Sequence, residues 1–172
     1  MTLKAFSILA FGLAAFGLSV VGPSSTQAQE VISVHDDWTS YVDRENDLKV
    51  CYIASRPSKQ EGTFKKRGEP YVMVSRRGPD KDDEQVSVTA GYPYKDDGKV
   101  EVVIGSTQFN LFVKDQWAWA PNAAGDTELV AAMARGNNMV VKAESRVGTT
   151  SADTYSLKGF SAARKAIAEA CS

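Results

Sequence analysis

The sequence predicts a mainly β domain, an antiparallel β-sandwich or flattened barrel, with two short helices, one of them at the C-terminus. Three observations predict this class. Apolar and polar residues alternate with a period of two over residues 86–92 and 100–104, as on half-buried strands. Turn-forming residues recur about every 8–12 residues, the spacing of short strands. Only residues 126–135 and the tail from Ser161 have apolar side chains at helical spacing.

The first 28 residues have the three parts of a secretory signal peptide. Lys4 is the only charge, and the apolar run over residues 5–21 is 17 residues long before a proline ends it. An A-x-A-like site predicts cleavage between Ala28 and Gln29. An uncleaved membrane anchor is the alternative, because a run of this length is just long enough to span a bilayer. Glycines within the run weaken such a helix and favour cleavage.

The 144 residues that remain after residue 28 are enough for one domain with its own core. We expect a flexible leader over residues 29–37 and a single β-rich domain over residues 38–172. This part keeps 19 basic and 21 acidic residues, a net charge of −2, so we expect no attraction to nucleic acid. No second apolar run approaches spanning length. We therefore expect a periplasmic protein, peripheral to the outer membrane or secreted.

The two cysteines, Cys51 and Cys171, both follow the expected cleavage site. An exported chain meets an oxidising compartment, where an even pair of cysteines is typical of a disulfide. A bridge between them would close nearly the whole domain. Two free thiols or a redox couple are the alternative, but the pair lacks the C-x-x-C spacing of such couples.

Short β-rich runs divided by polar or glycine-containing loops define the expected strands. They cover residues 49–54, 71–75, 86–92, 100–104, 108–113, 138–143 and 154–157. Asp97-Gly98 is a turn dipeptide that tolerates positive φ, so we expect a hairpin between the strands on either side of it. Longer loops are expected at 59–69 and at the acidic stretch 80–84.

Two helices complete the prediction. Asp126 can cap the first helix, Arg135 lies in its last turn, and Gly136 suits a left-handed residue after it. In the second helix, apolar side chains recur at Phe160, Ala163, Ile167 and Cys171. This stripe would bring the last cysteine to the core, within reach of the strand that carries Cys51.

The sequence contains few residues of the types that catalytic or metal sites require. The only histidine, His35, lies in the expected leader, away from any rigid nucleophile. One histidine and two cysteines are too few for a zinc site, and the acidic stretch 80–84 lacks EF-hand spacing. We therefore expect no catalytic residue, cofactor or metal. Carboxylates on separate strands leave no local motif, so a periplasmic carboxylate-dependent hydrolase, or a small-ligand carrier, stays open as an alternative.

Two features could form a surface that contacts a partner, which we expect to be an envelope or host protein. The first is a pair of basic clusters around one strand, formed by Lys65, Lys66, Arg67, Arg76 and Arg77. The second is Trp117 and Trp119, which point to the same side of an extended segment. The alternatives are charged loop ends that deter pairing between strand edges, and tryptophans packed in the core.

A series of short motifs follows one another along the chain between Trp38 and Cys171. They are Val50-Cys51-Tyr52-Ile53, Gly91-Tyr92, Ile104-Gly105, Leu111-Phe112, the stretch Leu129 to Gly136, Met139-Val140-Val141, Ser145-Arg146, Gly148-Thr149 and Asp153 to Phe160. This combination resembles the invasion-associated locus B proteins of alphaproteobacteria. The resemblance implies an exported, β-rich, non-catalytic protein of the periplasm or outer membrane, from a family named for host-cell invasion.

Overall fold

The computed structural model describes residues 29–45, 48–64, 66–77 and 84–172. The expected signal peptide therefore lies outside the described residues. In the described part, the elements in chain order are β1 (Glu30–His35), β2 (Trp38–Glu45), β3 (Leu48–Ser55), β4 (Lys59–Gly62), β5 (Tyr71–Arg77), β6 (Glu84–Thr89), β7 (Lys99–Ile104), β8 (Thr107–Lys114), β9 (Trp117–Trp119), α1 (Ala123–Arg135), β10 (Asn138–Glu144), β11 (Thr150–Ser156) and α2 (Phe160–Ala170).

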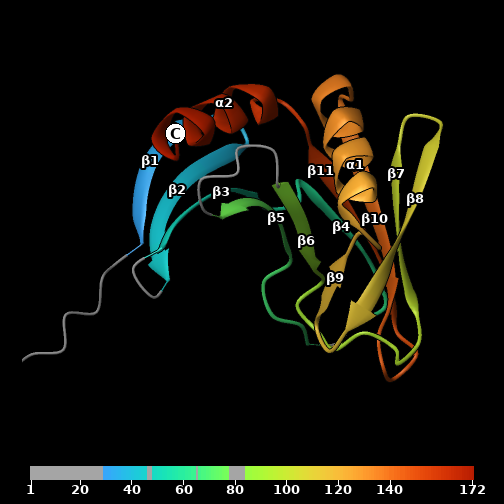
Figure 1. Cartoon of the computed structure of the whole chain (residues 1–172). Helices are drawn as coiled ribbons and strands as arrows, with labels where there is room; N and C mark the ends of the chain where they lie inside the picture. Colours follow the sequence, from blue (N-terminus) through green and yellow to red (C-terminus); the bar gives the residue numbers. More distant parts are fainter. Residues whose placement is uncertain (1–28, 46–47, 65, 78–83) are drawn as a thin grey trace, which may run out of the picture.

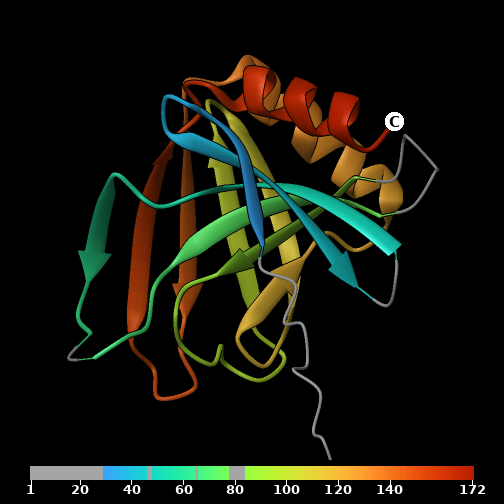
Figure 2. The ribbon, with the colours of Figure 1, turned by 90° about the vertical axis from the view of Figure 1, so that its left-hand side faces the viewer.

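These strands form one antiparallel sheet in the order β1-β2-β3-β5-β6-β9-β8-β7-β10-β11-β4. The sheet bends strongly, and both helices lie along the same side of it (Figures 1 and 2). The predicted mainly β, antiparallel architecture with two short helices, one at the C-terminus, is confirmed. One continuous bent sheet is closer to the flattened barrel than to a sandwich of two sheets.

The core lies between the helices and the sheet face that they cover. Strands β5 and β6 each carry valine at two alternate positions, and successive side chains of a strand point to opposite faces, so all four valines point into the core. These valines are Val72, Val74, Val86 and Val88. Helix α2 packs the ring of Phe160 edge-on against Trp38, with 4.9 Å between ring centroids. Trp38 and Phe160 therefore join the C-terminal helix to the start of β2.

The expectation of a flexible leader over residues 29–37 is wrong. Residues 30–35 form β1, which pairs with β2 from Glu30 opposite Val42 to His35 opposite Trp38. The β-branched residues at 31, 32 and 34 favour a strand, and β2 offers an edge for it to pair with. The β-domain thus begins at Glu30 rather than at residue 38.

The hairpin predicted across Asp97-Gly98 does not form. The turn itself is present, with φ of +56° at Asp97 and a hydrogen bond from Gly98 N to Lys95 O of 2.9 Å. Before this turn, however, the chain crosses to a bridge between Tyr94 and Ser145, so β6 pairs with β5 and β9 instead of β7. Strand β7 forms a hairpin with β8 across a two-residue loop that starts at Gly105.

Helix α1 begins earlier than the sequence predicts, and Asp126 does not cap it. Asn122 is the N-cap, and its side chain accepts a hydrogen bond from Gly125 N at 2.9 Å. Asp126 is buried and accepts a hydrogen bond from Val86 N at 2.8 Å, which fastens α1 to β6. Burial raises the pKa of Asp126, although the bond from Val86 partly opposes this.

Gly136 ends α1 with a φ of −81°, so it is not the predicted left-handed residue. Its lack of a side chain still matters, because a Cβ there would press on Ile104 and Leu157. The loop expected at 59–69 contains the short strand β4. Of the acidic stretch 80–84, only Glu84 is described.

Candidate functional site

A group of aromatic side chains crosses the sheet face that the helices leave open. We call it the aromatic face, and it consists of Tyr41, Tyr52, Tyr71, Phe112, Trp117 and Trp119. Pairing between strands sets this arrangement: Tyr41 lies opposite Tyr52, and Phe112 lies opposite Trp119. The alternate residues on the same strands point to the core, as Cys51, Val72 and Ala118 do.

The rings of the aromatic face support one another. Tyr41 stacks on Tyr52 with 4.9 Å between centroids, and Trp117 stacks on Trp119 at 6.4 Å. Tyr71 meets Trp117 edge to face at 5.4 Å, which joins Tyr71 to the tryptophan pair. Because the rings of each pair lie face to face, each ring covers part of one face of its neighbour. This arrangement holds large side chains in place at little further cost in conformational entropy.

The hydroxyls of Tyr52 and Tyr71 stay protonated at neutral pH. Burial, together with the charge of Asp43 and the neighbouring tyrosines, raises the pKa of Tyr52 to about 12. Burial also raises the pKa of Tyr71. Both groups can therefore donate hydrogen bonds to a partner's carbonyl or carboxylate oxygens.

A hollow of about 600 Å³ lies at the tyrosine end of the aromatic face. Its lining includes the three tyrosines, Tyr41, Tyr52 and Tyr71, together with Met73. The turn at Asp36 and the loop that begins at Arg56 also border it. Both of these charged side chains have ion-pair partners: Asp36 with Lys158 at 2.8 Å, and Arg56 with Glu69 at 3.1 Å.

The predicted tryptophan pair is part of this face. Trp117 and Trp119 are half-buried on the open side of the sheet and flank the fully buried Ala118. The adjacent Phe112 is 49% exposed, with its ring 5.6 Å from that of Trp119. That the tryptophans contact a partner stays a prediction.

The predicted basic surface does not form as a unit. Lys65 lies outside the described residues, as does the side chain of Arg77, and Lys66 is exposed. The side chain of Arg67 is only 5% exposed and makes two hydrogen bonds to Asp153, at 3.0 and 2.5 Å. Its Nε donates to Ala90 O at 2.8 Å. Arg67 is therefore part of the interior and not of a contact surface.

Arg76 is also turned inward, because it lies opposite Cys51 on the core face of the sheet. Its Nε lies 3.3 Å from Glu84, and Glu84 also accepts a hydrogen bond from Arg164 on α2 at 2.7 Å. Glu84 therefore holds cations from β5 and α2 together. Two of the five predicted basic contacts thus belong to internal ion pairs.

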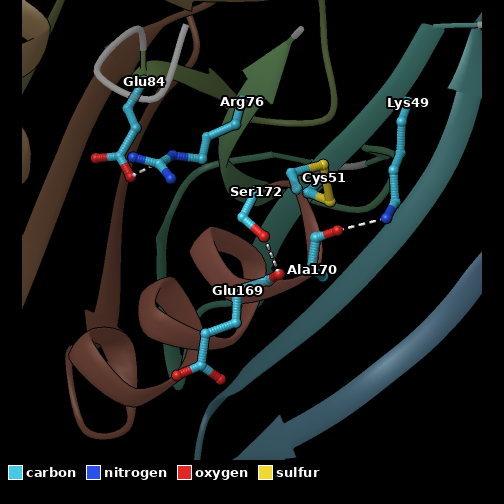
Figure 3. The surroundings of a disulfide bond; sticks show 8 residues. Lys49, Cys51, Arg76, Glu84, Glu169, Ala170 and Ser172 are labelled. Carbon is cyan, nitrogen blue, oxygen red and sulfur yellow. Dashed lines mark hydrogen bonds and ion pairs between the residues drawn. A yellow bond between two sulfur atoms is a disulfide. The ribbon is translucent and has the colours of Figure 1, made fainter. Parts of the chain in front are cut away.

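The predicted disulfide between Cys51 and Cys171 is present, with 6.1 Å between their Cα atoms (Figure 3). It fixes the end of α2 to β3, and the Arg76–Glu84 pair lies beside it. Lys49 Nζ donates a hydrogen bond to Ala170 O on the other side of the bridge. The C-terminal end of α2 is thus held by a covalent bond and a polar contact.

The described part of the chain contains neither a candidate metal site nor a helix that could cross a membrane. Among these residues, no group of three or more His, Cys, Asp or Glu side chains could hold a metal ion. Neither described helix has the length and apolar character needed to cross a membrane.

Comparison with known proteins identifies the family of this chain and a solved structure with a similar fold. The model of the invasion associated locus B (IalB) protein family matches residues 38–168. The chain belongs to the IalB family. Among solved structures, the crystal structure of invasion associated protein B from Bartonella henselae has a similar fold, with a TM-score of 0.57 and 15% sequence identity. The match covers 83% of this IalB-family chain and 97% of the Bartonella chain. The search of curated proteins finds no match.

Proposed function

We propose that this IalB-family protein is exported to the cell envelope and acts there by binding a protein partner through the aromatic face, without catalysing a reaction. The observation that carries the proposal is the set of aromatic rings on the open side of the sheet, in which Tyr41 contacts Tyr52 and Tyr71 contacts the tryptophans and, through them, Phe112. A group of neighbouring aromatic side chains on an uncovered sheet face is typical of interaction sites. Tyrosine and tryptophan are also the residues enriched where binding energy is concentrated.

The disulfide and the predicted signal peptide support export. A structural disulfide persists in the periplasm or outside the cell and is rare in the cytosol. Binding within the envelope would serve free-living and invasive bacteria alike, so a role in host-cell invasion is one form that this function can take.

A polypeptide suits the ring arrangement better than a sugar. Sugars stack on exposed ring faces, whereas in the pairs Tyr41–Tyr52 and Trp117–Trp119 each ring covers one face of the other. A protein partner can instead pack apolar side chains on the ring edges and accept hydrogen bonds from the hydroxyls of Tyr52 and Tyr71.

A carboxylate-dependent hydrolase would need a general acid with a raised pKa, but Asp126, whose pKa is raised, does not fit this role. Asp126 is packed between α1 and β6, where its carboxylate is bonded to Val86 N. A general acid in glycoside hydrolysis has to reach the substrate from a cleft and work with a second carboxylate nearby. Asp126 is instead part of the helix–sheet packing.

Quantitative capture from solubilised envelope fractions tests the proposal. We expect the immobilised mature protein to retain a saturable partner, and the Phe112→Glu variant to lose most of this binding, because Phe112 is the most exposed ring of the aromatic face. Val147→Glu is the matched control, since Val147 is 87% exposed and lies between β10 and β11, which carry none of these rings. Equal capture by the wild type and the Phe112→Glu variant would contradict the proposal.

A further inference from the structure

The two edges of the sheet differ in a way that points to a second interaction surface. Strand β4 is four residues long and exposed throughout, and it carries an ion pair between Lys59 and Glu61. Short, charged strands of this kind protect an edge from pairing with other chains. Strand β1, at the opposite edge, is the outermost strand in Figure 1 and contains neither lysine nor proline. The edge at β1 therefore lacks the lysine and the ion pair that protect β4, although its pairing with β2 is irregular between Val31 and Ser33.

Strand β1 also exposes apolar side chains in a regular arrangement. Val31 is 53% exposed and Val34 is 65% exposed. Val31 lies opposite Tyr41 and Val34 opposite Thr39, and the irregularity between Val31 and Ser33 keeps both valines on the side of the aromatic face. The ends of the strand, Glu30 and His35, lie opposite core-facing residues of β2 and so point to the other side.

The sequence of β1, Glu-Val-Ile-Ser-Val-His, is complementary to itself when it is read against its own reverse. In an antiparallel pair of two such strands, Glu30 of each copy faces His35 of the other, and Val31 faces Val34. The pair therefore matches an acid with an imidazole at both ends and valine with valine next to them, while Ile32 of each copy falls opposite Ser33 of the other at the centre, where the pairing of β1 is irregular. A two-fold symmetric interface requires this kind of self-complementarity.

We propose that β1 binds β1 of a second copy of this chain, antiparallel, so that the two sheets join into one. The two-fold axis of such a pair is perpendicular to the sheet, and it places both aromatic faces on the same side of the dimer. The valines of both copies then continue the apolar row from Tyr41 of one copy to Tyr41 of the other. The dimer thus offers a partner one doubled surface. The pairing itself does not depend on the proposed binding function.

Sedimentation equilibrium of the disulfide-bonded mature protein over a series of concentrations tests this inference without any partner. We expect a monomer–dimer equilibrium, and we expect Val34→Lys to raise the dissociation constant about tenfold or more, because two valine pairs are lost in each dimer. Val147→Lys is the matched control, and it should leave the constant unchanged. Circular dichroism of each variant establishes that the monomer is folded.

A charge exchange provides a second test that does not rely on Val34. Glu30→Lys should weaken the dimer, because it removes the acid that faces His35, and adding His35→Glu should restore the dimer by recreating an opposite pair. A wild-type protein that sediments as a monomer at its highest soluble concentration would overturn the proposal. Equal dissociation constants for Val34→Lys and Val147→Lys would do so as well.

Discussion

Arg67 and Asp153 form a buried, bidentate ion pair that joins segments 86 residues apart in the sequence. Their side chains are only 5% and 1% exposed. Burial lowers the pKa of Arg67, but the hydrogen bonds and charge of Asp153 more than offset it, so the pKa lies above its ordinary value. The pair holds the segment before β5 against β11.

Removal of Asp153 should destabilise the protein severely. Asp153→Ala leaves the Arg67 cation buried without its partner, and we expect a loss of roughly 3–5 kcal/mol in the free energy of unfolding, measured with urea. Arg67→Met combined with Asp153→Leu should lose much less, since no charge is left unpaired. Lys142→Ala, which breaks an exposed pair with Glu101, is the control and should cost less than about 1 kcal/mol. A similar small loss for Asp153→Ala would refute the assignment.

The disulfide should stabilise the C-terminal helix more than the rest of the fold. We expect Cys51→Ser combined with Cys171→Ser to lose about 2–5 kcal/mol of unfolding free energy. Hydrogen exchange should show greater loss of protection in α2, whose end the bridge fixes to β3, than in α1. Mass spectrometry after alkylation, with and without prior reduction, checks the bridge itself. Two thiols that react without a reductant would rule it out.

Asp126 should make stability depend on pH in a defined direction. Its folded-state pKa is raised above its ordinary value of 3.8, so the folded protein binds this proton more tightly than the unfolded chain does. The resulting cost is fully present above the raised pKa and disappears as the pH falls to the ordinary value. Asp126→Asn keeps an oxygen to accept the bond from Val86 N, so we expect it to be more stable than the wild type at neutral pH.

The difference between the Asn variant and the wild type should shrink as the pH falls toward 3.8. Asp126→Ala is the comparison, because it leaves Val86 N buried without an acceptor and should be about 1–3 kcal/mol less stable than Asp126→Asn at every pH. Urea denaturation over a pH series measures both. An Asn variant whose advantage grew on acidification would contradict the assigned direction.

Two glycines with positive φ should respond differently to alanine. Gly105, with φ of +60°, has open space around a Cβ, whereas Gly159, with φ of +87°, lies against the backbone of His35. Gly105→Ala should cost about 1–2 kcal/mol from backbone strain alone. Gly159→Ala should cost clearly more, because a Cβ also collides with the carbonyl of His35. Thermal unfolding compares the two, and equal losses would show that the close approach at Gly159 does not matter.

Local patterns were enough to predict most strands and both helices, because alternation and helical spacing are properties of neighbouring residues. Pairing partners were not predictable in this way. The turn at Asp97-Gly98 is present, yet the bridge from Tyr94 to Ser145 separates the strands that it was expected to join. The apolar residues of β1 are visible in the sequence, but the sequence does not indicate that they pair with the edge of β2.

The candidate site was predictable only in part for the same reason. Trp117 and Trp119 are two residues apart, so the sequence indicates their shared side. Tyr41, Tyr52 and Tyr71 lie on different strands, and only the register of the sheet brings them to one face. One signal could have identified them. Each of these tyrosines is an aromatic residue next to core-facing residues on its strand, at a position that points away from the core.

For Arg67 the local sequence predicts the wrong environment, because it indicates an exposed residue where the structure has a buried one. Three adjacent basic residues are typical of an exposed cluster, and nothing near them indicates Asp153. The ion pair arises because the loop before β5 folds back on the sheet, which places Arg67 over the ring of Phe64 and beside Asp153.

Site-specific photo-crosslinking in living cells tests the central claim, that the aromatic face binds a partner in the envelope, most directly. A photoreactive residue in place of Phe112 should form a discrete adduct with another protein, and the same residue in place of Val147 should not. Absence of an adduct from position 112, or the same adducts from both positions, would contradict the claim.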